Sequence, residues 1–326
     1  MKKVVVTGGA GYIGSHVCKA AASQGWEPVV IDNLSTGHRR LVQWGELVVL
    51  DTRETDKLTA VLCRIKPDAV MHFAASAYVG ESIQRPLDYY SNNVGGTLSL
   101  LQACIRAGVQ NLIFSSSCAI YGVPPSSPVH EETPASPLSP YGETKLACER
   151  MLNWCQTAHG INWVALRYFN AAGADPDAEI GELHDPETHL IPLALHCVSG
   201  KRTRLDIYGA DYPTRDGTAI RDYIHVTDLA SAHLLALDYL AQGGGSVALN
   251  LGTGRGHSVY EIVRAVERVT GRTVPYRICD RRPGDPPELY ALAESARRTL
   301  GWQPRFCDIG DIVRTAWDWE QRRDEL

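Results

Sequence analysis

The sequence lacks the features that mark several broad classes of protein. Its nine cysteines are scattered and include no Cys-x-x-Cys pair, which argues against a zinc site and against a disulfide framework. Such cysteines fit a reducing compartment, so we expect a cytoplasmic protein. No stretch reaches the roughly 18 consecutive apolar residues of a membrane span. The apolar run Val4–Val6 ends at Gly8 and Gly9, too early for a signal peptide.

The charge pattern also excludes a class of partner. The net charge is −5 and both signs are interspersed, so no basic face indicates a nucleic-acid partner. The sequence contains no internal repeat and no low-complexity tail. With 44% apolar residues in 326, the chain can bury a sizeable core, as about two domains or as one α/β unit with an added lobe.

The first 32 residues contain a nucleotide-binding pattern. An apolar strand at Val4–Thr7 leads into the glycine-rich stretch Gly8–Gly14, followed by a helical pattern up to Gly25. A second apolar strand, Val29–Ile31, ends in Asp32. The glycines allow a pyrophosphate to approach a helix N-terminus, and the carboxylate binds a ribose hydroxyl but repels a 2′-phosphate. The pattern therefore predicts NAD rather than NADP as cofactor.

The alternation of strands and helices continues and predicts a doubly wound parallel (Rossmann) sheet. The further strands are expected at Leu47–Leu50, Ala69–Phe73, Leu112–Phe114 and Val164–Leu166, and the helices at Leu58–Ile65, Tyr89–Ala107 and Tyr141–Gly160. We expect residues 1–168 to form the NAD-binding domain, with segments at about 222–255 returning to it, and residues 169–326 to form mainly a smaller, discontinuous substrate lobe. Beyond residue 168, helices are expected at Leu190–Val198, Asp228–Leu240, Val259–Val269 and Ile309–Trp319, and strands near Leu205–Tyr208, Val247–Leu251 and Val274–Arg277.

The candidate catalytic residues are a tyrosine and a lysine four positions apart. Tyr141 and Lys145 would share one helix face, where the ammonium group favours phenolate and lowers the pKa of the phenol. Ser115–Ser117 follows a strand, at the end of a parallel sheet where ligands bind. Taken alone, a serine run is more often a turn. Arg221 and the pair Arg281–Arg282 are candidates for binding a diphosphate, although a single arginine is more often merely solvated.

Together these residues resemble the extended short-chain dehydrogenases/reductases and, within them, the UDP-galactose 4-epimerases. The matching stretches are Val6–His16, Asp32–Leu34, His72–Ala74, Val79–Ser82, Tyr89–Asn93, Phe114–Ser117, Ser139–Lys145, Leu166–Asn170, Asp211–Val226 and Arg281–Asp285. The first stretch and the Tyr/Lys pair mark only the superfamily, whereas Asp211–Val226 is more specific to epimerases that act on UDP-sugars.

The resemblance implies roles for individual residues. Tyr141 would be the catalytic base, helped by Lys145 and Ser117. The implied cofactor-binding residues are Gly8, Gly11, Tyr12, Ile13, Gly14, Asp32, Asn33, Ser35, Thr36, Asp51, Thr52, Phe73, Ala74, Ala75, Asn92, Lys145 and Phe169. The implied substrate-binding residues are Ser117, Tyr141, Asn170, His189, Leu190, Asp206, Tyr208, Arg221, Arg282, Asp285 and Leu289. The resemblance implies no metal.

The implied reaction is the NAD-dependent inversion of carbon 4 of a UDP-sugar through a 4-keto intermediate, with transient NADH. UDP-glucose and UDP-galactose are the expected pair. N-acetylated forms stay open because Leu289 stands where family members have a tyrosine or a cysteine that limits the sugar pocket, and leucine is smaller than tyrosine. Family members also pair the helices at Tyr89–Ala107 and Tyr141–His159 between subunits, which implies a homodimer.

Three other readings stay open. A UDP-pentose 4-epimerase would use the same residues. A nucleotide-sugar dehydratase needs carboxylates beside the catalytic serine, but Ser117 is followed by Cys118-Ala119-Ile120, so this reading is disfavoured. A non-catalytic NAD-binding protein would have no need for Tyr141, Lys145 and Ser117 together.

Overall fold

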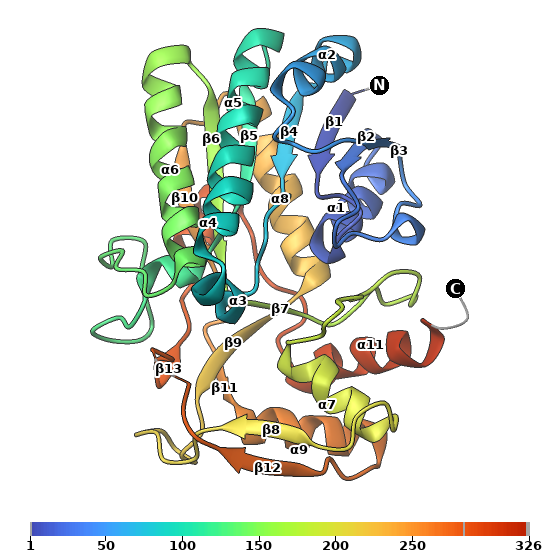
Figure 1. The fold of residues 1–326 in the computed structure, drawn as a ribbon, viewed down its shortest axis with the longest axis vertical. Coiled ribbons are helices and arrows are strands. Elements are labelled where there is room, and N and C mark those ends of the chain that lie inside the picture. Colours follow the sequence, from blue (N-terminus) through green and yellow to red (C-terminus); the bar gives the residue numbers. More distant parts are fainter. Residues whose placement is uncertain (1, 283, 324–326) are drawn as a thin grey trace.

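A seven-stranded parallel sheet forms the centre of the larger half of the molecule in the computed structural model, which describes residues 2–282 and 284–323 (Figure 1). The strand order is β10-β6-β5-β4-β1-β2-β3. The strands are β1 (Lys2–Thr7), β2 (Trp26–Asp32), β3 (Glu46–Val49), β4 (Ala69–His72), β5 (Asn111–Ser117), β6 (Asn162–Tyr168) and β10 (Val247–Leu251). The order reverses at β1, and ligands of such sheets bind at the carboxyl ends beside that point. The predicted doubly wound fold is confirmed.

Helices cover both faces of this sheet, because successive side chains of each strand point to opposite sides. Val4 and Val6 pack with α1 and α8 on one face, whereas Val5 packs with α2, α5 and α6 on the other. These helices are α1 (Tyr12–Ser23), α8 (Val226–Ala241), α2 (Thr55–Ile65), α5 (Gly96–Ala107) and α6 (Pro140–His159). The near-continuous apolar strands of the sequence thus reflect burial on two sides.

The second lobe lies below the carboxyl edge of the sheet in Figure 1. Its core contains Ile191, Ile207, Ile262 and Ile312. Its helices are α7 (Leu190–Val198), α9 (Val259–Thr270) and α11 (Ile309–Arg322), and α10 (Glu294–Leu300) lies against β10 and α8. Its strands are the parallel pair β8 (Leu205–Tyr208) and β12 (Tyr276–Cys279), and a set built on β9 (Ile220–His225) with β7 (Asn170–Ala172), β11 (Gly256–Ser258) and β13 (Glu288–Leu289).

Several elements differ from the sequence expectation. The helix expected at Tyr89–Ala107 is divided into α4 (Pro86–Tyr89), a π-helical turn η2 (Tyr90–Gly95) and α5. The strand expected at Val274–Arg277 is shifted towards the C-terminus as β12, because Tyr276–Cys279 pairs with β8. The short helix α3 (Val79–Gln84) and strands β7, β9, β11 and β13 were not predicted. Short strands that pair far along the chain leave only weak periodicity in the sequence.

No helix in the part of the chain that the structure describes combines the length and the apolar character that a membrane span requires.

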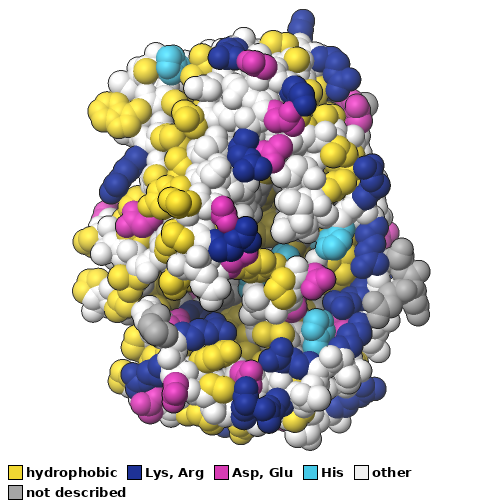
Figure 2. All heavy atoms as spheres, viewed as in Figure 1, with side chains coloured by type: hydrophobic (Ala, Val, Ile, Leu, Met, Phe, Trp, Pro, Cys, Tyr) yellow, Lys and Arg dark blue, Asp and Glu magenta, His cyan; other side chains and the backbone are white. Residues whose placement is uncertain are grey.

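The two lobes enclose a hollow on the face shown in Figure 2, and Lys and Arg side chains gather on the smaller lobe beneath it. This hollow lies at the carboxyl edge of the sheet, where β5 ends in the serine run and β6 leads into the second lobe. The fold therefore places the serine run beside a lobe rich in cationic side chains.

Candidate active site

Tyr141 lies in the first turn of α6, beside the end of β5. Ser139 is the N-cap of this helix, and its Oγ accepts the backbone N–H of Gly142 at 3.2 Å. Pro140 occupies the first helical position, where its missing N–H leaves no hydrogen bond unmade. The predicted helix start is confirmed, and the phenol is near the positive end of the helix dipole.

Gly142 brings α6 unusually close to the segment that follows the serine run. A Cβ atom added at Gly142 would lie 2.5 Å from the carbonyl oxygen of Ala119 and 2.9 Å from Cβ of Pro137. Ala119 belongs to η3 (Cys118–Tyr121), a 3-10 turn that begins directly after Ser117. Only glycine allows this approach, which holds Tyr141 against Ser117.

We expect Gly142→Ala to lower kcat by roughly 10²-fold. The clash with Ala119 O must shift the N-terminus of α6, and a displacement of about 1 Å at a reacting group lowers the rate by about this factor. Steady-state kinetics and a thermal melt would measure activity and stability. Gly80→Ala on α3 is the matched control, since an added Cβ there meets nothing within 4 Å. Unchanged kcat in Gly142→Ala would show that the close approach does not set the geometry of the site.

Lys145 lies one helical turn after Tyr141, inside the protein. Its Nζ donates a hydrogen bond of 2.7 Å to the carbonyl oxygen of Ser115 and lies 5.8 Å from the centre of the Tyr141 ring. Burial lowers the pKa of Lys145 to about 8. The structure thus brings Tyr141, Lys145 and the serine run together, as the sequence predicts.

The pKa of Tyr141 differs from the expectation. Burial raises it to about 12, and a hydrogen bond with Ser117 acts in the opposite direction. The prediction that Lys145 lowers the pKa of Tyr141 below its usual value is therefore wrong for the chain alone. Removal of the phenol from water disfavours phenolate more strongly than the surrounding groups favour it.

The glycine-rich stretch forms a cradle at the N-terminus of α1. Gly8 has φ of 73°, and a Cβ there would lie 2.6 Å from the backbone nitrogen of Ala74. At Gly14 a Cβ would lie 2.3 Å from the carbonyl oxygen of Gly8. No side chain caps α1, whose N-cap is Gly11, so its first N–H groups are free to bind an anion. The cradle fits the pyrophosphate of a dinucleotide.

Asp32 ends β2 beside this cradle, as predicted. Its carboxylate accepts the backbone N–H of Ala10 at 3.0 Å and of Leu34 at 2.8 Å. These bonds fix the orientation of the carboxylate, and burial raises its pKa. Asn33 donates to Asp51 at 2.9 Å, so the ends of β2 and β3 are joined. This edge offers the polar groups that a ribose and an adenine need.

The remaining cofactor candidates lie around the same edge. Phe73 packs against the ring of His233, and Asn92 donates to Ser76 Oγ at 3.1 Å. Thr52 and Phe169 are buried. Tyr12 donates from its hydroxyl to the carbonyl oxygen of Gly173. The other candidates, which lie in the turns that follow β2 and β4 or at the start of α1, are Ile13, Ser35, Thr36, Ala74 and Ala75.

The second lobe brings the arginine Arg221 close to this site. Arg221 on β9 forms an ion pair with Asp285, and it lies opposite Leu289 of β13 in the strand register. Burial raises the pKa of the Cys118 thiol to about 12, and the charge of Arg221 acts against that rise. Arg221 therefore lies within electrostatic reach of the residue next to Ser117.

A second arginine of this lobe lies flat against an aromatic ring. The guanidinium carbon of Arg282 is 4.1 Å from the ring centre of Tyr208, which is 37% exposed. Asn170 on β7 donates to the carbonyl oxygen of Asp222 at 3.0 Å. An arginine stacked in this way keeps its N–H groups available for phosphate.

Two substrate candidates have their polar atoms occupied by other side chains. Asp206 on β8 accepts hydrogen bonds from Arg277 on β12 at 2.6 Å and from Arg202, which precedes β8, at 3.3 Å. His189 precedes Leu190 at the N-terminus of α7, and its Nδ1 contacts Glu182. Glu182 and Glu187 raise the pKa of His189 to about 10 against its burial.

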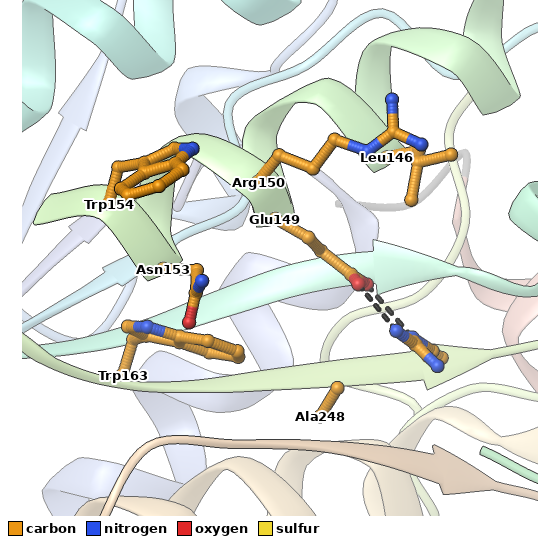
Figure 3. A pocket seen from close by; sticks show the side chains of 8 residues that line it. Leu146, Glu149, Arg150, Asn153, Trp154, Trp163 and Ala248 are labelled. Carbon is orange, nitrogen blue, oxygen red and sulfur yellow. Dashed lines mark hydrogen bonds and ion pairs between the residues drawn. The ribbon is translucent and has the colours of Figure 1, made fainter. Parts of the chain in front are cut away.

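Sequence reasoning missed the buried ion pair that anchors α6. Glu149 Oε2 and Arg167 lie 2.6 Å apart, and Glu149 Oε1 also accepts the hydroxyl of Ser116 at 2.5 Å. Glu149 follows Lys145 by four residues on the same helix face, and this spacing could have indicated that Glu149 also points into the protein. Figure 3 shows Glu149 pointing from α6 towards the sheet, in a groove of about 320 Å³ beside Trp154 and outside the candidate site.

A buried aspartate between the two lobes was also missed. Asp222 on β9 is fully buried, and its carboxylate accepts the backbone N–H and the hydroxyl of Thr253, which follows β10. Burial raises the pKa of Asp222 to about 6 against these hydrogen bonds. The residue joins β9 to the loop after β10 and therefore fixes the position of neighbouring Arg221.

Comparisons with known proteins place the chain among the epimerases. The NAD dependent epimerase/dehydratase family model matches residues 4–252. A UDP-glucose 4-epimerase of Rhizobium meliloti (strain 1021) is 50% identical over 322 residues, 99% of this chain and 98% of that protein. The crystal structure of UDP-glucose 4-epimerase from Brucella ovis in complex with NAD is 54% identical, with a TM-score of 0.96 and 98% of both chains covered. The enzyme from Bifidobacterium longum in complex with NAD+ and UDP is 36% identical, with a TM-score of 0.95 and 99% of both chains covered.

Proposed function

The chain belongs to the NAD dependent epimerase/dehydratase family, and from this premise we propose that it inverts carbon 4 of a UDP-sugar, with UDP-glucose and UDP-galactose as its main pair. The observation that carries the proposal is the placement of Tyr141, Lys145 and Ser117 together at the carboxyl end of β5. A non-catalytic NAD-binding protein would not need this arrangement.

The residues around α1 fit NAD. Gly8, Gly11 and Gly14 would hold the pyrophosphate at the N-terminus of α1, and Asp32 would hold a ribose. Side chains at Gly8 and Gly14 would collide with the backbone of this cradle. When bound, NAD would serve as the acceptor of a hydride from carbon 4 and as its donor in the reverse transfer. We propose that the sheet unit holds NAD and that the second lobe holds the UDP moiety.

The proton is handled by the chain itself. Tyr141 accepts the proton of the sugar O4 hydroxyl and later returns it, with Ser117 hydrogen-bonding the phenol oxygen. Lys145 lies 5.8 Å from the centre of the Tyr141 ring, and its hydrogen bond to the Ser115 carbonyl oxygen fixes the ammonium group there. Burial raises the pKa of Tyr141 to about 12 and the hydrogen bond with Ser117 acts against this rise, so Ser117 is the neighbour that favours the phenolate needed to accept the O4 proton.

The second lobe would supply most of the substrate-binding free energy. Arg221 and Arg282 offer guanidinium groups for the diphosphate, while Asp285 orients Arg221 and Tyr208 supports Arg282. Contacts on the uridine and diphosphate leave the sugar free to turn and to receive the hydride on its other face. Leu289 is buried at this edge, next to Arg221 in the strand register.

The test is incubation of the purified protein with a panel of UDP-sugars and no added NAD. We expect UDP-glucose and UDP-galactose to interconvert with the NAD that the protein carries, and chromatography would separate the epimers. The N-acetylated hexoses and the pentoses in the panel define the preferred sugar. Faster conversion of UDP-xylose than of UDP-glucose would support the pentose reading instead, and a 4-keto-6-deoxy product would identify a dehydratase.

We expect Asp32→Asn to weaken NAD binding by about 1.5–3 kcal/mol, roughly 10- to 150-fold, because a charge-assisted hydrogen bond to the ribose is lost. The preference for NAD over NADP should fall at the same time, since the carboxylate no longer repels a 2′-phosphate. Fluorescence titration with both dinucleotides measures these affinities. Asp68→Ala is the control, because this carboxylate accepts a backbone N–H of Lys3 away from the cradle. An unchanged NAD/NADP ratio in Asp32→Asn would contradict the assignment.

We propose a homodimer formed through α5 and α6. Leu98 and Ile105 on α5 are seven residues apart on one helix face and are exposed, and Trp154 on α6 is 71% exposed. Leu98→Glu/Ile105→Glu should give single-chain mass in light scattering after gel filtration, because charges cannot be buried unpaired in the interface. Ile278→Glu, on the exposed face of β12, should leave the dimer intact. A wild-type protein at single-chain mass would refute the dimer.

We also propose that the enzyme works in the cytoplasm. All nine cysteines are free, and four of them, Cys18, Cys104, Cys148 and Cys197, are buried. Such thiols persist in a reducing compartment.

A further inference from the structure

Two glutamates and two histidines meet in the segment between β7 and α7. In the sequence they form two Glu-x-His units, Glu182-Leu183-His184 and Glu187-Thr188-His189. One ligand atom from each of the four side chains lies within 4.8 Å of the others. We propose that Glu182, His184, Glu187 and His189 bind one divalent transition-metal ion, with Zn²⁺ as the best match. Imidazole nitrogens and carboxylate oxygens are both common zinc ligands.

The side chains already converge on one point. Nδ1 of His184 lies 2.8 Å from Oε1 of Glu182, and Nδ1 of His189 contacts the same oxygen. Oε1 of Glu187 lies 3.5 Å from that His189 nitrogen. Ligand atoms of tetrahedral zinc lie about 3.4 Å apart, given bond lengths of about 2.0–2.2 Å. Small changes in side-chain torsions would therefore replace the hydrogen bonds with metal bonds.

The charge of the cluster favours a cation. The side chains of Glu182 and Glu187 are each 6% exposed. Across residues 2–282 and 284–323, their ion pairs are with His184 and His189 only. The two glutamates carry two negative charges, which the proton on His189 offsets only in part, and a divalent ion that displaces this proton would cancel both charges. Buried carboxylates are either paired with cationic side chains or bound to metals.

A nearby acidic cluster shows the contrast. Asp175, Asp177 and Glu179 also lie close together, but Nζ of Lys19 is 2.7, 3.4 and 2.7 Å from their carboxylates. The lysine already supplies the positive charge there. This second cluster therefore offers a matched control for the first one.

The backbone around the cluster holds the ligands in place. Oε1 of Glu187 accepts the N–H groups of Thr188 and His189 at 2.7 and 2.8 Å, which orients its carboxylate. His38 Nε2 lies 2.7 Å from the carbonyl oxygen of Leu183, and the His184 ring packs edge-on against Tyr12. The metal would therefore tie the segment leading into α7 to the NAD-binding unit.

The test is zinc binding to the NAD-containing protein after chelator treatment. Isothermal titration calorimetry with zinc chloride should give one Zn²⁺ per chain, and Co²⁺ should produce the visible absorption band of a tetrahedral site. His184→Asn/His189→Asn should weaken zinc binding by at least about 100-fold. Asp177→Asn should leave it unchanged.

Circular dichroism and NAD content would show whether the double variant is folded. Should it not fold, Glu187→Gln replaces it in the test. This variant removes a single ligand charge and should also weaken zinc binding. Absence of a stoichiometric site in the wild-type protein would overturn the proposal. So would zinc affinity that survives in the folded double variant, or that is lost in Asp177→Asn. None of these readouts depends on epimerase activity.

Discussion

Replacement of Tyr141 by phenylalanine is expected to lower kcat by about 10²- to 10⁴-fold, the range that a general acid–base group contributes. The phenylalanine keeps the ring and removes only the oxygen that hydrogen-bonds Ser117 and exchanges the proton with the sugar. KM should change far less than kcat, because the diphosphate contacts of Arg221 and Arg282 are untouched. Steady-state kinetics with UDP-galactose would measure both parameters.

NAD content distinguishes a chemical defect from a structural one. Tyr141→Phe should retain its NAD, because Asp32 and the glycine cradle lie on other elements. Tyr276→Phe, on the partly exposed strand β12, is the matched control and should act at the wild-type rate. If Tyr141→Phe interconverts the substrates at near wild-type rate, another group must take the proton.

The largest effect on stability is expected from Arg167→Met. This substitution leaves Glu149 buried without its cation, and loss of one partner of a buried ion pair destabilises a protein by about 3–5 kcal/mol. The Glu149 and Arg167 side chains are 7% and 12% exposed, and Arg167 also donates to the Tyr121 hydroxyl at 3.0 Å. Urea denaturation would measure the free energy of unfolding.

A double variant separates pairing from packing. Glu149→Gln/Arg167→Met should recover part of the lost stability, because no charge is then left buried alone. Arg106→Met is the control, since its pair with Asp56 is exposed and should contribute at most about 1 kcal/mol. Equal destabilisation in the single and double variants would mean that Arg167 stabilises the fold only through packing.

Local sequence patterns were sufficient to predict the sheet and its cofactor edge. Gly8–Gly14 and Asp32 are close in sequence, and the helix N-terminus and strand end that they imply follow from adjacent residues. The start of α6 at Pro140 and the face shared by Tyr141 and Lys145 are likewise local properties. The resemblance to a known family added the second lobe's contribution, which periodicity alone does not reveal.

Other features depend on contacts far apart in the chain. Strand β9 forms only where it pairs with β7, β11 and β13, so no local pattern marks it. The pKa of Tyr141 depends on how deeply α6 and β5 bury the phenol, and the spacing to Lys145 does not reveal this. Asp222 and its partner Thr253 are 31 residues apart. Contacts of this kind can be identified only from the three-dimensional structure.

The measurement that tests the account most directly uses UDP-glucose carrying deuterium at carbon 4. If one chain oxidises and reduces the same carbon, the UDP-galactose formed should keep all its deuterium at that position and take up no hydrogen there from water. Mass spectrometry and NMR of the product would show this after many turnovers. Loss of the label to solvent, or its absence from the epimer, would contradict the proposed reaction.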